Sequence, residues 1–149
     1  MIGGDGRLGS PGPQGPAGPS YGELVFVAGD VGTSTTALYM PPGYIAVAAS
    51  DPKDFTVSRA MTVVGMLYKA RTGHVSPSAE QIVFSLRKNG SPESLALLVA
   101  EGATTGDTGA QSGVSFAAGN TIGIQVDKAG SGITTSPADA AVTLIVTYP

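Results

Sequence analysis

The sequence contains no cysteine and no tryptophan, and it has one histidine, His74, among 149 residues. The absence of cysteine excludes disulfide bonds, thiolate metal sites and a cysteine nucleophile. A Ser-His-Asp triad would have to use His74, which lies in the segment Thr72-Gly73-His74-Val75-Ser76-Pro77. The glycine, serine and proline of that segment are typical of an exposed loop. We therefore expect a protein that is not an enzyme.

Motifs for nucleotide binding, calcium binding and nucleophilic catalysis are also missing. No G-x-x-x-x-G-K phosphate loop, no G-x-S-x-G nucleophile elbow and no D-x-[DN]-x-[DN]-G calcium loop occurs. The stretch Gly4–Gly9 matches G-x-G-x-x-G, but proline-rich sequence follows it where a dinucleotide site needs a helix. We expect no cofactor and no dedicated metal ligands, although a calcium ion, or an ion on a three-fold axis, stays open.

Charge is scarce. Charged residues make up 13%, Lys and Arg together number 8, and the formal net charge is −3. Nucleic-acid binding requires a basic patch, so this function is not expected.

The longest apolar stretch, Ala60 to Tyr68, is interrupted by Thr62 and falls short of the roughly 20 residues that cross a bilayer. No secretory signal is visible at the N-terminus, which favours assembly in a cytoplasm without membrane insertion.

What the sequence does contain is a glycine repeat. Six consecutive G-X-Y triplets carry glycine at every third position: Gly3, Gly6, Gly9, Gly12, Gly15 and Gly18. Pro13, Pro16 and Pro19 fill X positions, and Pro11 fills a Y position. This pattern is typical of the collagen triple helix, in which only glycine fits at the crowded axis. A flexible linker would share the composition but has no reason to keep the period.

The repeat predicts three chains, because a single chain of this kind buries nothing. At about 3 Å of rise per residue, the roughly 18 residues of the six triplets would span on the order of 50 Å. Six triplets are few for a stable triple helix, so a trimeric domain downstream is expected to hold the chains in register. The short N-terminal segment, with Ile2 and Leu8 as its large apolar residues, is the candidate for docking onto a capsid or fibre protein.

Residues 21–149 predict an all-β head. Leu24–Val27 is an apolar run. In residues 55–68 apolar side chains alternate with others at Phe55, Val57, Met61, Val63 and Leu67. Arg59 interrupts this pattern, so the segment forms either one bent strand or two. Period-2 alternation continues in three further segments: Ile82, Phe84, Leu86; Ile122, Ile124, Val126; Val142, Leu144, Val146 and Tyr148. Asn89-Gly90 and Gly119-Asn120 mark turns. Several short strands with such turns favour a sandwich or jelly roll.

A stalk of this kind joined to such a head resembles the C1q/TNF-like jelly rolls. The run Ile82–Gly90 resembles the strand and turn of collagen-linked heads on phage and virus fibres, and Gly113–Val126 is similar to a second strand and turn of those heads. Asn120 stands where those heads usually have Asp. Bacterial and spore-surface collagen-like proteins have a similar plan. The resemblance implies a homotrimer with three heads packed around a three-fold axis.

These observations favour a virion-surface structural protein, namely a phage head fibre, a decoration spike or a tail-fibre tip. Two alternatives stay open: a bacterial or spore-surface collagen-like protein, and a lectin-like module that binds host glycans or a receptor. Loops at the far tip of the head are the candidate contacts, represented by Thr35, His74 and Asp107. The five tyrosines are candidates for either a glycan platform or ordinary packing.

Overall fold

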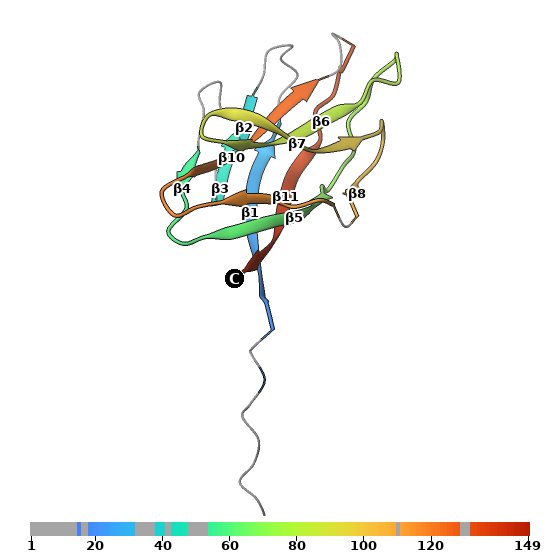
Figure 1. Ribbon diagram of the computed structural model, residues 1–149. Helices are drawn as coiled ribbons and strands as arrows, with labels where there is room; N and C mark the ends of the chain where they lie inside the picture. The colour runs from blue at the N-terminus through green and yellow to red at the C-terminus, as the bar shows by residue number, and fades with distance from the viewer. Residues whose placement is uncertain are drawn as a thin grey trace, which may run out of the picture.

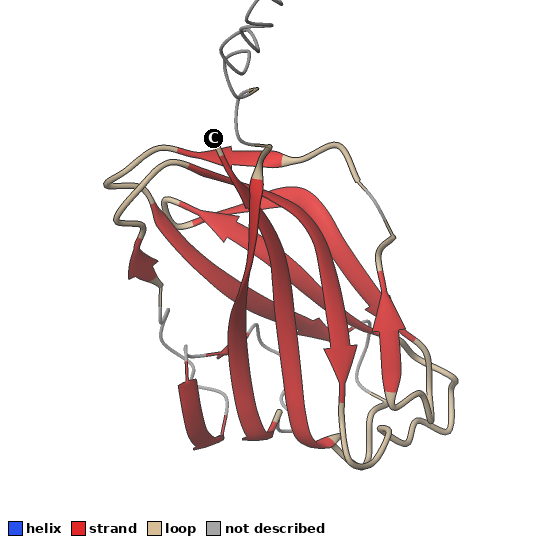
Figure 2. Cartoon of the chain, turned by 90° about the horizontal axis from the view of Figure 1, so that it is seen from below, coloured by secondary structure: helices blue, strands red, loops and turns tan. Residues whose placement is uncertain are grey.

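The computed structural model describes residues 15, 18–31, 38–40, 43–47, 54–109, 111–128 and 132–149 (Figure 1). Every secondary-structure element within these ranges is a β-strand, as Figure 2 shows. The expectation of an all-β protein is therefore confirmed for this part of the chain. Most of the glycine repeat, the docking residues Ile2 and Leu8, and the tip residue Thr35 lie outside the described residues.

The strands form two sheets. Sheet A has the order β3 (Gly43–Val47), β1 (Ser20–Asp30), β11 (Ala138–Tyr148) and β5 (Met61–Lys69), with β8 (Thr105–Asp107) and β9 (Val114–Phe116) paired to β5. Sheet B has the order β2 (Leu38–Met40), β10 (Thr121–Lys128), β6 (Ile82–Lys88) and β7 (Ser91–Val99), with β4 (Phe55–Thr56) paired to β10.

Connections that cross between the sheets make this a jelly-roll-like sandwich. Both long strands at the chain ends, β1 and β11, lie side by side in sheet A, although they are first and last in sequence. The pairings are antiparallel except for β1 with β3, which is parallel. Strands that are adjacent in space but distant in sequence are expected where a sandwich is built from crossing connections.

The core lies between the sheets and follows the period-2 pattern. Ile82, Phe84 and Leu86 of β6 are fully buried, as are Ile122 and Val126 of β10. The alternate residues Val142, Leu144 and Val146 of β11 are buried opposite them. Burying each such side chain stabilises the fold by about 1.5–3 kcal/mol relative to exposure. The inward residues predicted for these three strands are confirmed, except that Tyr148 at the end of β11 is only half-buried against the core.

A β-bulge corrects one expectation. Met61 and Val63 are buried as predicted, but Leu67, placed on the same parity, is 38% exposed, whereas Tyr68 is buried. The pairing with β11 slips between Ile145 and Val146, so that Val64 is an extra residue in β5. A bulge of one residue exchanges the two faces of the strand beyond it. The segment 55–69 forms two strands, β4 and β5, separated by the loop that contains Arg59.

The predicted turns are present. Asn89 and Gly90 both have positive φ values, 50° and 83°, as a two-residue type I′ hairpin between β6 and β7 requires. At the second turn Asn120 Oδ1 accepts a hydrogen bond of 2.8 Å from the Ala117 amide. An asparagine therefore supplies the acceptor that a turn needs at this position.

The pairing of β1 with β11 distinguishes the two ends of the described head. Ser20, the last residue of the last G-X-Y triplet, pairs with Tyr148, so the chain enters and ends at one end of the sandwich (Figure 1). We name this the stalk end. Asp30 pairs with Ala138 at the opposite end, which we name the distal end. Because β1 begins at Ser20, sheet A is continuous with the segment predicted to form the stalk.

Candidate interaction surface

The outer face of sheet A is apolar and open. Tyr21 is 72% exposed, Val25 44% and Leu67 38%, and these three are among the most exposed large apolar side chains of the described residues. Half-buried Val64 and Ile145 lie between them. The register sets Val25, Thr143 and Leu67 in one row across β1, β11 and β5. An exposed apolar patch on a rigid sheet is typical of a protein–protein contact.

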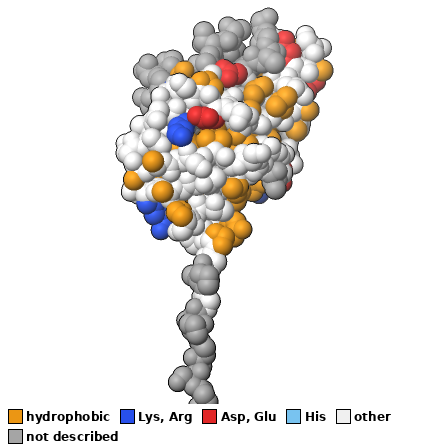
Figure 3. Space-filling model, in the orientation of Figure 1, with side chains coloured by type: hydrophobic (Ala, Val, Ile, Leu, Met, Phe, Trp, Pro, Cys, Tyr) orange, Lys and Arg blue, Asp and Glu red, His pale blue; other side chains and the backbone are white. Residues whose placement is uncertain are grey.

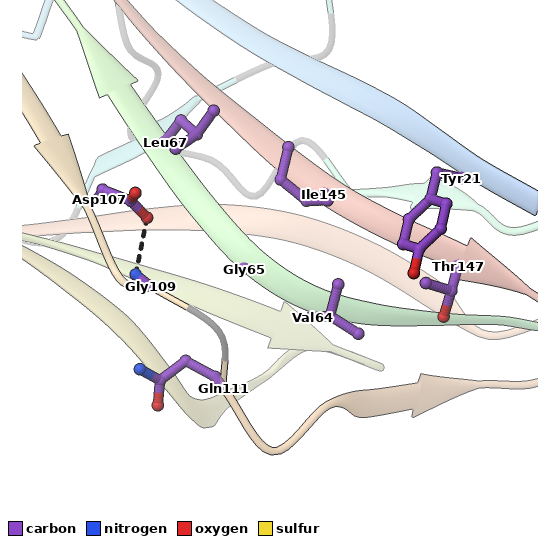
Figure 4. Close-up of a pocket in the computed structure, with 9 residues that line it drawn as sticks. All are labelled: Tyr21, Val64, Gly65, Leu67, Asp107, Gly109, Gln111, Ile145 and Thr147. Atoms are coloured by element: carbon purple, nitrogen blue, oxygen red, sulfur yellow. Dashed lines mark hydrogen bonds between the residues drawn. The ribbon is translucent and has the colours of Figure 1, made fainter.

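A hollow of about 520 Å³ lies in this face (Figure 4). The residues that line it are Tyr21, Val64, Gly65, Leu67, Asp107, Gly109, Gln111, Ile145 and Thr147. Gly65 lies opposite Ile145, and the bulge next to it turns Leu67 outward. The strand irregularity therefore creates both the floor of the hollow and its apolar wall.

The rim of the hollow is polar on the β8 side. Asp107 Oδ1 accepts a hydrogen bond of 2.7 Å from the Gly109 amide, drawn as a dashed line in Figure 4. Thr108 Oγ1 accepts one of 2.9 Å from the Met66 amide, which ties this turn to the bulged part of β5. Gln111 donates through Nε2 to the Thr108 carbonyl. Asp107 thus belongs to the side of the sheet and does not lie in a loop at the distal tip.

Sheet B has a different outer face. Arg87 of β6 is almost fully buried there and donates to Asp54 Oδ1 at 3.1 Å and to the Gly90 carbonyl at 2.6 Å. Its guanidinium carbon lies 4.6 Å from the centre of the Tyr39 ring. A buried ion pair needs such additional partners to offset desolvation. Polar contacts therefore cover the part of this face around Arg87, whereas Leu98 of β7 lies on the same face and is 57% exposed.

His74 lies toward the distal end, but the expectation of an exposed histidine is wrong. Its side chain is fully buried and Nε2 donates to the Glu80 carbonyl at 2.7 Å. The bridge between Thr72 and Ala138 places this loop next to the start of β11. Nδ1 has no hydrogen-bond partner among the described residues. His74 therefore supports the loop from inside and offers no surface to a partner.

The other predicted site residues are only partly described. Gly15 and Gly18 are exposed, and a Cβ added at either position would meet no atom within 4 Å in the single chain. Gly3, Gly6, Gly9 and Gly12 lie outside the described residues, as do Ile2, Leu8 and Thr35. Within the described ranges, no group of three or more His, Cys, Asp or Glu side chains is arranged to hold a metal ion. No helix in these ranges is long and apolar enough to span a membrane.

Comparison with protein-family models and with curated proteins gives no match.

Of the residues of this face, the sequence analysis named Asp107 and, among the five tyrosines, Tyr21, but it did not single out Val25, Leu67 or Ile145 as a shared surface. The run Leu24–Val27 has apolar side chains on both faces of the strand. This was the sequence signal that both faces of β1 pack against other groups. Ile145 lies between Thr143 and Thr147 on the parity expected to face solvent. Leu67 could not be assigned, because the bulge that turns it outward has no signature in the local sequence.

Proposed function

We propose that this chain is the subunit of a homotrimeric virion structural protein, with a collagen-like stalk of residues 1–20 and a β head displayed on the virion surface. The observation that carries the proposal is the direct junction between the G-X-Y repeat and β1. The repeat predicts three chains, and sheet A, to which β1 belongs, has exposed apolar side chains on its outer face.

The stalk decides which sheet faces the neighbouring copies. A triple helix holds its three chains against one another at a shared axis. The strand that follows it directly must begin next to that axis, and this strand is β1 of sheet A. Sheet B is joined only through later connections and packs on the far side. The outer face of sheet A is therefore the surface that three heads would bury against one another.

Composition agrees with this arrangement. Charged residues are few. On the outer face of sheet A, the described charged side chains of β1, β5, β8 and β11 are Glu23, Lys69, Asp107 and Asp139, and Asp139 pairs with Arg71. Apolar side chains are scattered over the face of the head that Figure 3 shows. A closed three-fold assembly removes an apolar patch from water, whereas an isolated monomer would expose it.

The proposed location is the virion surface, as a head fibre, decoration spike or tail-fibre tip. The resemblance of Ile82–Gly90 and Gly113–Val126 to collagen-linked fibre heads supports it. In this proposal, residues around Ile2 and Leu8 dock onto a capsid or fibre protein, and the distal end points outward. A bacterial or spore-surface collagen-like protein would use the same stalk and head on a different particle.

Two measurements test the proposal. The mass of the full chain by light scattering should be three times the chain mass of 14.8 kDa. Peptides of the chain should be found by mass spectrometry in purified virions of the producing strain and should be depleted from cell-surface fractions. A monomeric mass refutes the trimer. A trimer that copurifies with the cell or spore surface, and not with virions, selects the alternative location.

A second candidate function is glycan binding in the sheet A hollow, which requires that the heads leave this face open to solvent instead of burying it against one another. The exposed Tyr21 ring, the carboxylate of Asp107 and the amide of Gln111 line the same hollow (Figure 4). An aromatic face together with acceptor groups is a suitable combination for a sugar ring, which has apolar faces and polar edges. A glycan array with the full chain tests this role. A trimer that binds no glycan eliminates it and leaves the structural role intact.

A further inference from the structure

A second hollow lies where the chain enters the head. It measures about 340 Å³ and opens at the stalk end, between the edge of sheet A and the end of β11. The residues that line it are Pro19, Ala60, Met61, Thr62, Ser115, Phe116, Thr147, Tyr148 and Pro149. Met61 and Phe116 are buried beneath it, whereas Ala60, Ser115 and Pro149 are exposed at its rim. We call this the stalk groove.

The walls of the stalk groove are held in place by contacts of their own. The guanidinium carbon of Arg59 lies 3.5 Å from the centre of the Tyr148 ring. A Cβ at position 22 would lie 2.9 Å from Cε2 of this ring, so the glycine leaves the room that the ring needs. Lys88 Nζ donates to the Ser115 carbonyl at 2.7 Å and lies over the Phe116 ring. These contacts organise the groove before anything enters it.

The lining suits a proline-rich chain. Extended proline-rich segments bind grooves lined by aromatic side chains, because the polyproline II conformation is already formed and little entropy is lost on binding. The lining of the stalk groove includes half-buried Tyr148 in its wall, buried Phe116 beneath it, and one proline of the chain itself, Pro19. The segment that precedes Pro19 carries Pro11, Pro13 and Pro16.

We infer that the stalk groove receives the Pro16–Pro19 segment of a neighbouring copy; this inference rests on the proposed trimer. The chain's own Pro19 forms one edge of the groove because it is fixed to β1 through Ser20. In a triple helix the closest neighbours of Pro19 are the corresponding triplets of the other two chains. Each head would then hold the last triplets of its neighbour, which would set the register of a stalk of only six triplets.

Cross-linking of the full chain tests the inference, and the absence of native cysteine makes it specific. The variant Ala17→Cys/Ala60→Cys places one thiol at a Y position of the stalk and one at the exposed rim of the groove. A short bismaleimide should join position 17 of one copy to position 60 of the next. The product expected on a denaturing gel is a covalent trimer. The matched control, Ala17→Cys/Ala100→Cys, carries its second thiol on an exposed alanine that does not line the groove.

The outcomes separate this inference from the proposed function. Covalent trimers from the 17/60 pair, absent from the 17/100 pair and from each single variant, support the seating of the neighbour's segment. Links within one chain only, or no 17-to-60 link by peptide mass spectrometry, overturn the inference. If light scattering still gives a trimer in that case, the proposed trimer stands. A monomeric mass before cross-linking refutes the proposed function itself.

Discussion

Tyr68 is a buried phenol without a hydrogen-bond partner among the described residues. Its ring packs against Phe84 with the centroids 5.1 Å apart, so the side chain contributes to the core through its ring. Burial raises the pKa of Tyr68 from 10.0 to about 12, because the phenolate is poorly solvated there. The buried hydroxyl therefore lowers the stability of the folded head, because it loses its hydrogen bonds to water and gains none in return.

We expect Tyr68→Phe to raise the free energy of unfolding by about 1 kcal/mol near pH 7, since it removes an unpaired buried hydroxyl. The wild-type protein should also lose stability as the pH rises from 10 to about 12, because its unfolded chain releases the Tyr68 proton at lower pH than the folded head. Urea unfolding at pH 8 and pH 11 measures both effects. Tyr21→Phe, which removes an exposed hydroxyl, is the matched control; an equal alkaline loss in Tyr68→Phe and wild type would contradict the assignment.

Arg87 and Asp54 make the second prediction at this scale. Asp54→Ala should destabilise the head by about 3–5 kcal/mol, because it leaves the buried Arg87 guanidinium without its carboxylate. Replacing both residues, as in Asp54→Ala/Arg87→Leu, should recover much of that loss. Asp139→Ala, which breaks the exposed Arg71–Asp139 pair, should cost about 0–1 kcal/mol. If Asp54→Ala and Asp139→Ala lower the free energy of unfolding equally, burial of the Arg87–Asp54 pair has no energetic consequence.

Among the elements, the distal loops are joined to one another around His74. The Gly102 amide donates to the His74 carbonyl at 3.0 Å, and the Gly132 amide donates to Glu80 Oε2 at 2.7 Å. Ser76 donates its amide to Glu101 Oε1 at 3.0 Å. Three segments that are distant in sequence therefore share one hydrogen-bond network, with a buried imidazole at its base.

We expect His74→Ala to destabilise the head by about 2–4 kcal/mol, since it leaves a cavity and an unpaired Glu80 carbonyl. Hydrogen exchange should become faster at the Gly102 and Gly132 amides, whereas the exchange rates of the β6 amides should change less. Val75→Ala, at an exposed neighbouring position, should change stability by less than about 0.5 kcal/mol. Unchanged exchange at Gly102 and Gly132 in His74→Ala would argue against a shared network.

At the scale of the whole molecule, the proposed trimer depends on the outer face of sheet A. We expect Val25→Glu/Leu67→Glu to lower the mass of the full chain from trimer toward monomer, because like charges would be buried at the three-fold interface. The far-UV spectrum of the head should not change. Leu98→Glu, at a 57% exposed leucine of sheet B, is the matched control and should remain trimeric. A trimer that survives the double substitution would place the contact elsewhere.

Much of this architecture could be predicted from local sequence. Period-2 alternation identifies the buried residues of β6, β10 and β11, and Asn89-Gly90 identifies the hairpin, because both signals depend on residues within a few positions of one another. The glycine period of residues 3–18 likewise predicts three chains without any knowledge of the head. The all-β class, the positions of β6, β10 and β11, and the expectation of three chains therefore follow from the sequence by itself.

Only the tertiary structure decided how these strands combine. The pairing of β1 with β11 places Tyr21 next to Thr147, and the extra residue Val64 turns Leu67 outward, so the apolar face exists only once distant strands are aligned. His74 is buried because loops from three parts of the chain close over it, although the segment Thr72–Pro77 has the composition of an exposed loop. Long-range pairing and enclosure depend on contacts between segments far apart along the chain, whereas the sequence patterns report only on neighbours.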